Sequence, residues 1–164
     1  MMHEPRRGHD SAGVAFRDAT PILRVADFDA SVAYYVEALG FELAWQDGRF
    51  GLVRRGDAGL MLCQGSQGCS STWLFIGVSD ADALHDELRS RGARIRHPPT
   101  NYPWRSRELH VFDLDGHVLR LASDAPAGGP LGEWLDEEGV RWQAHPDGSW
   151  TRVPDPEGRE PRDA

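Results

Sequence analysis

The chain has 164 residues, of which 40% are hydrophobic and 27% charged, and its formal net charge is -8 at pH 7. This length supports one buried core, and the sequence lacks the apolar run of about 18 residues that a membrane-spanning helix needs. The acidic balance argues against a nucleic-acid partner, because such binding depends on cationic contacts to phosphate. We therefore expect one globular domain with no membrane or nucleic-acid partner.

Residues 1–18 carry charge but no apolar segment, which predicts a flexible N-terminal arm and not a secretory signal. Cys63 and Cys69 lack the CxxC spacing of a redox or zinc motif. They are typical of free thiols in a reducing compartment. We therefore expect a cytoplasmic protein.

Residues 22–43, ILRVADFDASVAYYVEALGFEL, predict a strand, a helix and a second strand. Asp27 or Asp29 can cap the start of the helix, and Gly40 supplies the left-handed residue that ends it. The apolar side of the helix has the i, i+3, i+4, i+7 spacing and comprises Val32, Tyr35, Val36 and Leu39. Turns rich in Gly and Asp then separate the strands expected at 41–46, 49–55 and 59–64.

Residues 74–95, LFIGVSDADALHDELRSRGARI, repeat this pattern after a glycine-rich linker at 64–71. Ser79 with Asp82 resembles a capping box, and Gly92 ends the helix. The apolar side of this helix comprises Ala81, Leu84 and Leu88. After it we expect a strand at 93–97, a long loop containing Pro98, Pro99 and Pro103, and strands at 107–113 and 117–123.

Both units have the order strand, helix and three strands, which predicts an α+β fold of two βαβββ modules at 19–66 and 71–124. A single module leaves one face of its small sheet bare, so the two must combine. We expect two cupped mixed sheets that enclose a concave cavity between them. Such a cavity is the expected place for a small-molecule ligand.

Residues 125–164 are expected to form a C-terminal extension beyond these modules. The segment LGEWLDEEG (131–139) predicts a short helix, and residues 139–153 predict a hairpin with its turn at Pro-Asp-Gly. An isolated hairpin is marginally stable in water, so it should cover the edge or mouth of the cavity, or a partner subunit. The Pro-rich, charged end that follows predicts disorder.

The doubled units, with RVADFDASVAYYVEALGF and FDLDGHVLRL, resemble the vicinal oxygen chelate superfamily over residues 19–124. This superfamily includes glyoxalase I, extradiol dioxygenases, fosfomycin-modifying enzymes and bleomycin resistance proteins. The first three hold a metal with His and Glu side chains on the cupped sheets. The corresponding positions here are Thr20 with Pro21, Trp73 and Arg120. Since a guanidinium would repel a cation, the resemblance implies no metal site and no cofactor.

Within the superfamily, the pattern is most similar to that of the bleomycin resistance proteins, which have Pro-Trp followed by Arg-Glu. Here PWRSRE (103–108) carries both pairs, with one extra residue between them. By position, the resemblance implies ligand-contacting rings at Trp45, Phe50, Phe75 and Trp104. Flat rings stack planar ligands and attract cationic ones, although core packing is the alternative for each ring on a strand.

Two arginines leave the charge of the ligand open. Arg105, with Ser106, replaces a single glycine of the bleomycin resistance pattern, and Arg120 lies on the last strand. Bleomycin-type drugs combine a planar bithiazole with a cationic tail, which an acidic, aromatic-lined groove would suit. The two guanidinium groups make an anionic or neutral ligand the alternative.

Glu108 and His110 lie two residues apart and should share a strand face. They could form a general acid/base pair, half of a metal site, or a hydrogen-bonded polar pair lining a pocket.

We predict a metal-free protein that sequesters a bleomycin-like or other planar antibiotic. We expect it to be a homodimer, since family members pair their sheets across subunits. A lyase, isomerase or dioxygenase of the same fold is one alternative, and a regulatory module whose groove receives the tail or another protein is another. The predicted ligand-binding residues are Trp45, Phe50, Trp73, Phe75, Trp104, Glu108, His110 and Arg120.

Overall fold

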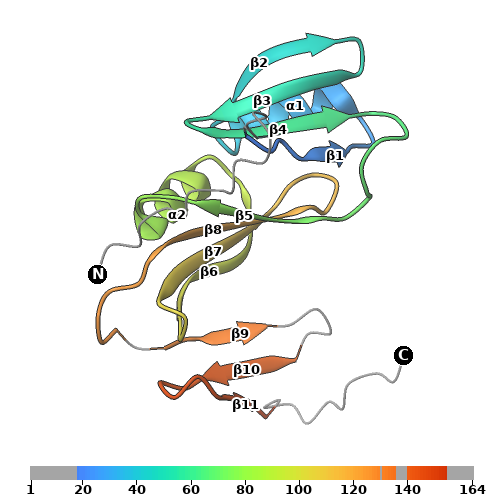
Figure 1. Cartoon of the computed structure of the whole chain (residues 1–164). Coiled ribbons are helices and arrows are strands. Elements are labelled where there is room, and N and C mark those ends of the chain that lie inside the picture. The colour runs from blue at the N-terminus through green and yellow to red at the C-terminus, as the bar shows by residue number, and fades with distance from the viewer. Residues whose placement is uncertain (1–17, 130, 136–139, 155–164) are drawn as a thin grey trace, which may run out of the picture.

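A computed structural model describes residues 18–129, 131–135 and 140–154. Figure 1 shows two four-stranded mixed sheets, each with one helix, and a three-stranded sheet near the C-terminal end. The first sheet has the order β1-β4-β3-β2, with β1 (Ile22–Arg24), α1 (Phe28–Glu37), β2 (Glu42–Asp47), β3 (Phe50–Arg55) and β4 (Ala58–Cys63). The second has the order β5-β8-β7-β6, with β5 (Trp73–Gly77), α2 (Ala81–Ser90), β6 (Arg94–Tyr102), β7 (Ser106–Phe112) and β8 (Val118–Asp124).

In each sheet the first strand pairs in parallel with the last, and the remaining pairs are antiparallel. This is the strand topology of a βαβββ module, because a helical crossover joins the parallel edge strand to the other three strands. The prediction of an α+β fold with two such modules is confirmed. None of the described helices is long and apolar enough to cross a membrane.

Local capping chemistry explains where both helices begin and end. Asp27 caps α1 by accepting a hydrogen bond from the backbone N–H of Ala30 at 3.0 Å. Asp80 caps α2 and accepts from two backbone N–H groups of its first turn, so the predicted capping box led by Ser79 is wrong by one residue. Gly40 and Gly92 follow the helices with φ of 71° and 77°, as their positions predicted.

The two modules share one hydrophobic core. Leu23 and Val53 of the first module belong to the same buried cluster as Leu109 and Leu119 of the second. The expected apolar side of α1 is partly wrong, because Val36 is 36% exposed. Tyr35 and Leu39 are buried as expected, and the helix also buries Phe28 and Ser31.

A polar contact also joins the modules at the turn between β7 and β8. The Tyr35 hydroxyl donates to Asp113 Oδ2 at 3.1 Å, and the backbone N–H of His117 donates to Asp113 Oδ1 at 2.8 Å. His117 Nε2 lies 2.8 Å from the carbonyl oxygen of Arg24 on β1. All three side chains are buried, so this network holds the first helix and strand against the second sheet.

The segment expected to be a long proline loop is part of strand β6. This strand runs through Pro98 and Pro99, and its pairing with β7 shifts register on both sides of His97. Proline is tolerated here because β6 is an edge strand and bulges leave some N–H groups outside the ladder. The chain then reverses tightly, and Arg105 takes a left-handed φ of 66°.

The third sheet has the order β11-β10-β9, with β9 (Glu133–Leu135), β10 (Arg141–Ala144) and β11 (Trp150–Arg152). Strands β10 and β11 are antiparallel. The short helix expected from 131–139 is wrong, because residues 133–135 form a strand that pairs with β10. Residues 136–139 of that expectation, like the N-terminal arm and the end after 154, lie outside the described residues.

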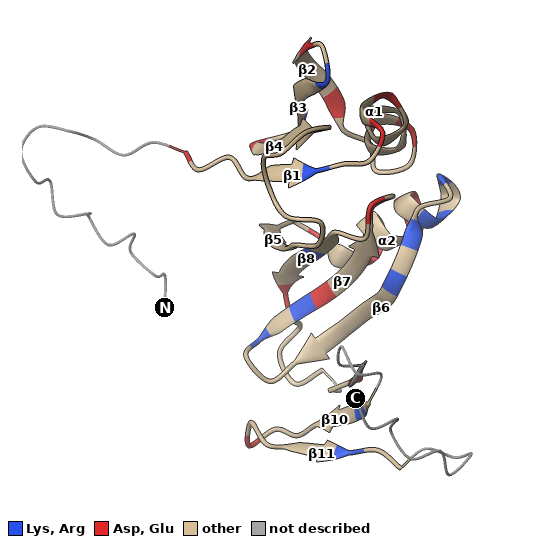
Figure 2. Cartoon of the chain, turned by 90° about the vertical axis from the view of Figure 1, so that its right-hand side faces the viewer, with Lys and Arg blue, Asp and Glu red and all other residues tan. Residues whose placement is uncertain are grey.

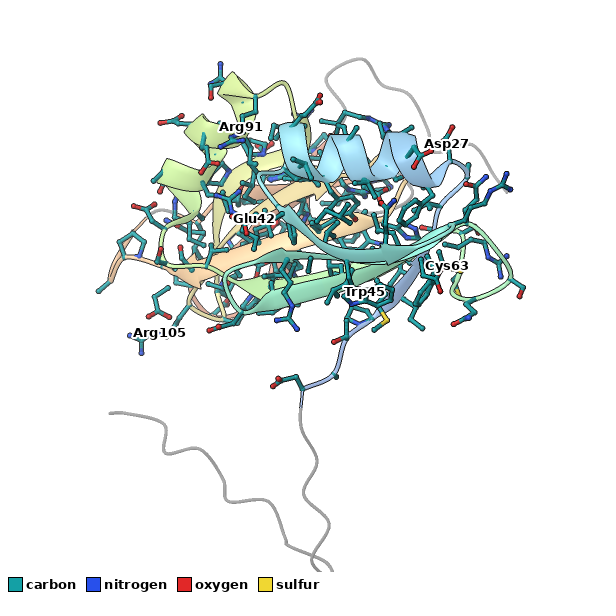
Figure 3. The ribbon with its side chains drawn as sticks, turned by 90° about the horizontal axis from the view of Figure 1, so that it is seen from above. Asp27, Glu42, Trp45, Cys63, Arg91 and Arg105 are labelled. Carbon is teal, nitrogen blue, oxygen red and sulfur yellow. The ribbon has the colours of Figure 1, made fainter. Side chains whose placement is uncertain are left out.

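Both helices lie on one side of the two main sheets, as the view from above shows (Figure 3). Trp45, labelled in that view, lies on the side of the first sheet away from α1. Each main sheet therefore has one face in the shared core and one open face.

Candidate ligand-binding site

Cross-strand register defines the open face of the second sheet. Phe75 on β5 pairs with Arg120 on β8, and Arg120 pairs with His110 on β7. Directly paired residues share a face, so these three side chains project together. Their neighbours Leu109 and Leu119 alternate to the other face and enter the core.

Glu108 is the buried centre of this face. Its side chain has no exposed surface, and Oε1 accepts hydrogen bonds from Trp104 Nε1 at 2.7 Å and Arg120 Nη2 at 3.1 Å. Oε2 accepts from Arg120 Nε and lies 3.4 Å from His110 Nε2. A buried carboxylate is stable only with such partners.

The partners of Glu108 also decide its protonation state. Burial acts to raise the pKa of this carboxyl group, but hydrogen bonds from His110, Arg120 and Trp104 and the charge of Arg120 outweigh burial and hold the pKa at about 2. Glu108 is therefore ionised at neutral pH, and both of its oxygens are engaged. It is not a free base for a substrate.

His110 is 2% exposed and is surrounded by other rings. Its ring centroid lies 5.6 Å from that of Trp73 and 5.9 Å from that of His97. Burial lowers the pKa of His110, and the contact with Glu108 opposes this shift only in part. The imidazole is therefore neutral at pH 7 and completes the polar base of the site.

Three large aromatic side chains surround this base and remain open to solvent. Trp73 is 38% exposed, Phe75 65% and Trp104 50%. The Arg120 guanidinium carbon lies 5.8 Å from the Phe75 ring centroid and 5.5 Å from that of Trp104. Grouped exposed rings of this kind mark an interaction surface more often than a solvated one.

The tight turn between β6 and β7 explains the position of Trp104. Its ring stacks on buried Tyr102 with centroids 4.6 Å apart and planes 13° from parallel. The Tyr102 hydroxyl has no hydrogen-bond partner among the described residues, and burial is the main cause that raises its pKa. Trp104 is thus fixed by stacking on one side and by Glu108 at its indole nitrogen.

The structure brings six of the eight predicted residues together and leaves two apart. Trp45 and Phe50 lie on the open face of the first sheet, with ring centroids 5.6 Å apart and Trp45 41% exposed. Across the described part of the chain, no ring contact joins this pair to Trp73, Phe75 or Trp104. The eight residues therefore form two aromatic surfaces in one chain.

Arg96, Tyr102 and Trp150 border the site but were not predicted. The irregular pairing around His97 turns Arg96 to the open face, where its guanidinium carbon lies 4.8 Å from the Trp73 ring centroid. Within residues 18–129, 131–135 and 140–154, no carboxylate lies within ion-pair distance of Arg96. Figure 2 shows basic positions gathered along β6. Arg96 was expected in the strand at 93–97 and Trp150 in the hairpin at 139–153, but neither was linked to the site, and Tyr102 was expected in the proline loop outside a sheet.

The residues of this face do not fit a divalent metal ion. Among the described residues there is no group of three or more His, Cys, Asp or Glu side chains that could hold one. Glu108 and His110 are the pair on this face that most resembles part of a metal site. Both Glu108 oxygens are already hydrogen-bonded, however, and the Arg120 guanidinium lies against them. A cation would have to displace a charge of the same sign.

A pocket of about 700 Å³ lies elsewhere, between α2 and the turn joining β3 to β4. The Arg55 to Glu87 ion pair, with 2.7 Å between Nη2 and Oε2, forms part of its wall, and none of the eight predicted residues lines it. No exposed aromatic ring lines this pocket. The aromatic face is therefore the better candidate site.

Comparison with known proteins agrees with this architecture. The model of the Glyoxalase/Bleomycin resistance protein/Dioxygenase superfamily matches residues 16–121. A comparison with curated proteins gave no match.

Solved structures with the same fold include a bleomycin-binding protein and a bleomycin resistance determinant. The bleomycin-binding protein from bleomycin-producing Streptomyces verticillus, complexed with copper(II)-bleomycin, is 31% identical with a TM-score of 0.54, covering 69% of this chain and 98% of that chain. A bleomycin resistance determinant encoded on the transposon Tn5 is 27% identical with a TM-score of 0.59, covering 66% of this chain and 98% of that chain. TioX from Micromonospora sp. ML1 shares the fold at 23% identity and a TM-score of 0.59, covering 66% of this chain and 99% of that chain.

Proposed function

The chain belongs to the Glyoxalase/Bleomycin resistance protein/Dioxygenase superfamily, and we propose that it binds a planar aromatic small molecule on the open face of its second sheet and sequesters it unchanged. The observation that carries this proposal is the exposure of Trp73, Phe75 and Trp104 around the fixed pair of Glu108 and Arg120. Each stacked ring contributes about 0.5–1.5 kcal/mol beyond the area it buries.

The class of ligand follows from the relatives and the charges. Two similar structures are described as a bleomycin-binding protein and a bleomycin resistance determinant, which supports a bleomycin-like or other planar antibiotic. Glu108 is already saturated by its neighbours, so it offers nothing to a ligand cation. Arg96 has no carboxylate within ion-pair distance among the described residues, and its charge favours a neutral ligand or one with an anionic or acceptor group near Trp73.

Binding without catalysis agrees with the protonation states. A general base needs a free lone pair within reach of the substrate proton. Glu108 is ionised but enclosed by four donor contacts, and the neutral imidazole of His110 is buried behind Trp73. The polar groups on this face thus orient the rings and do not offer a reactive atom.

A second copy of the chain would bring the two aromatic surfaces together. Trp45 and Phe50 on the first sheet and the ring set on the second sheet both lie on open faces. We propose a homodimer in which the first sheet of one copy faces the second sheet of the other, with the ligand between them. Such a closed groove would bury most of a planar ligand.

Titration followed by tryptophan fluorescence tests the proposal. The panel comprises bleomycin, phleomycin, and planar naphthalene derivatives with an anionic, neutral or cationic substituent. At least one compound should quench the fluorescence saturably, and mass spectrometry should recover it unchanged. Folded protein whose fluorescence responds to no member of the panel, or a ligand recovered as product, would contradict sequestration.

A further inference from the structure

The C-terminal sheet is seated closely on the edge strand β6. The backbone N–H of Gly132 donates to the carbonyl oxygen of Asn101 at 3.2 Å. A Cβ atom at Gly132 would collide with the Thr100 side chain, and one at Gly129 would lie 2.8 Å from Asn101 Nδ2. Glycine at both positions permits this approach, which covers the backbone edge that β6 would otherwise expose.

The same seating brings a tryptophan to the site. Trp150 on β11 pairs with Ala144 on β10, and Ala144 is 3% exposed, so this face of the small sheet is turned toward the rest of the chain. The Trp150 ring centroid lies 5.6 Å from that of Trp104 and 6.0 Å from that of Tyr102. Trp104 therefore has Tyr102 stacked on it and Trp150 inclined toward it.

Trp150 belongs to a part of the chain that the family model does not include. That model ends at residue 121, before β9 begins. The Tn5 determinant and the Streptomyces protein are each covered over 98% of their length by 66% and 69% of this chain. The extra sheet is thus an addition next to a site that the family fold already forms.

We propose that the C-terminal sheet is a fixed wall of the ligand site and that Trp150 is the residue through which it contacts the ligand and limits its size. This inference rests on the proposed binding function. A planar molecule on the exposed side of Trp104 has Arg120 at one edge and Trp150 at another. Selectivity should then depend on a residue outside the two modules.

The rival interpretation is that Trp150 only anchors the small sheet. In that case the Trp150 ring would contact protein atoms alone, and a bound ligand would leave the surroundings of Trp150 unchanged. The two interpretations differ in whether Trp150 senses ligand in the intact chain. A measurement of ligand contact in the original chain can therefore separate them without comparing the affinities of variants.

Fluorine NMR of protein labelled with fluorotryptophan provides this measurement. The probes are metal-free bleomycin and anilinonaphthalene sulfonate, and single Trp-to-Phe variants assign the signals. We expect the signals of Trp73, Trp104 and Trp150 to shift together with one binding constant. If Trp73 and Trp104 shift while Trp150 does not, the inference fails and the binding function stands; if no signal shifts with either probe, both fail.

The ligand affinities of three variants test whether the C-terminal sheet is a wall of the site. Trp150→Ala should weaken binding of the responding probe about fivefold, as expected for the loss of one stacked ring. Gly132→Ala should weaken it to a similar extent because it displaces the sheet while keeping the indole. Arg152→Ala, an exposed residue on the same strand, is the control and should bind as the original chain does. Full affinity in both Trp150→Ala and Gly132→Ala would overturn the inference.

Discussion

The indole N–H of Trp104 donates a 2.7 Å hydrogen bond to Glu108, although Trp104 lies in the turn before β7 and Glu108 is buried on that strand. The bond connects an exposed ring to the ionised centre of the site. Trp104 is therefore held at a set angle before any ligand arrives. A ring that is already oriented loses little conformational freedom on binding.

Glu108→Gln should reduce stability markedly. The substitution keeps the size of the side chain but leaves Arg120 with a partly buried charge and no counter-ion. Removal of one partner from a buried pair is strongly destabilising, and partial exposure of Arg120 moderates the effect. We expect a loss of about 2 kcal/mol in the free energy of unfolding, measured by urea denaturation. An unchanged urea midpoint would show that the ion pair of Glu108 and Arg120 contributes nothing to the stability of the fold.

The same carboxylate predicts a pH dependence. Its pKa is about 2 in the folded chain and 4.5 in the reference state, so ionised Glu108 contributes stability that is complete above pH 4.5. That contribution should disappear as the pH falls from 4.5 toward 2. Burial raises the pKa of Asp113, which has the opposite effect, so the measurement is the difference between the original chain and Glu108→Gln. If the stabilities of the two proteins change in parallel between pH 4.5 and pH 2, the low pKa of Glu108 is contradicted.

Trp104→Ala should affect ligand binding more than folding. Half of the indole is exposed, but one face contacts the ligand in our proposal, and we expect an affinity loss of about tenfold. The lost stacking on Tyr102 and the lost hydrogen bond should lower stability by about 1 kcal/mol. Leu114→Ala is a matched control, because Leu114 is 43% exposed at the far turn. Calorimetry and fluorescence titration on both variants separate the two effects.

Spacing along the sequence predicted several parts of the structure, although the capping box at Ser79 and the helix expected at 131–139 were wrong. The doubled pattern, the glycines after each helix and the shared face of Glu108 and His110 depend on spacing alone, and the structure has all three. The course of β6 was not predictable from proline content, since an edge strand with bulges tolerates Pro98 and Pro99. Contacts that depend on how separate segments pack, such as Trp150 against Trp104, have no local signal.

Arg96→Gln should change the charge preference of the site. The guanidinium lies over Trp73 and Phe112 and is partly buried, so its charge acts on a ligand bound nearby. Within the naphthalene panel, we expect the original chain to prefer the anionic compound and the variant to lose most of that preference. Affinity for the neutral compound should change little. An equal effect on all three compounds would mean that Arg96 acts through packing and not through charge.

Trp45→Glu should convert a dimer into a monomer. Every residue of β2 is exposed, and Trp45 on the open face of the first sheet is 41% exposed, which leaves a large apolar ring in contact with water in an isolated chain. A partner that covered this face would bury the indole, and a charge placed there would remain without water or a counter-ion. We expect sedimentation to show a dimer for the original chain and a monomer for the variant, with the same far-UV circular dichroism. Val36→Glu, on the helix side and 36% exposed, should stay dimeric. If both variants and the original chain sediment as monomers, one chain alone must bind the ligand, and Trp45 and Phe50 then have no part in the site.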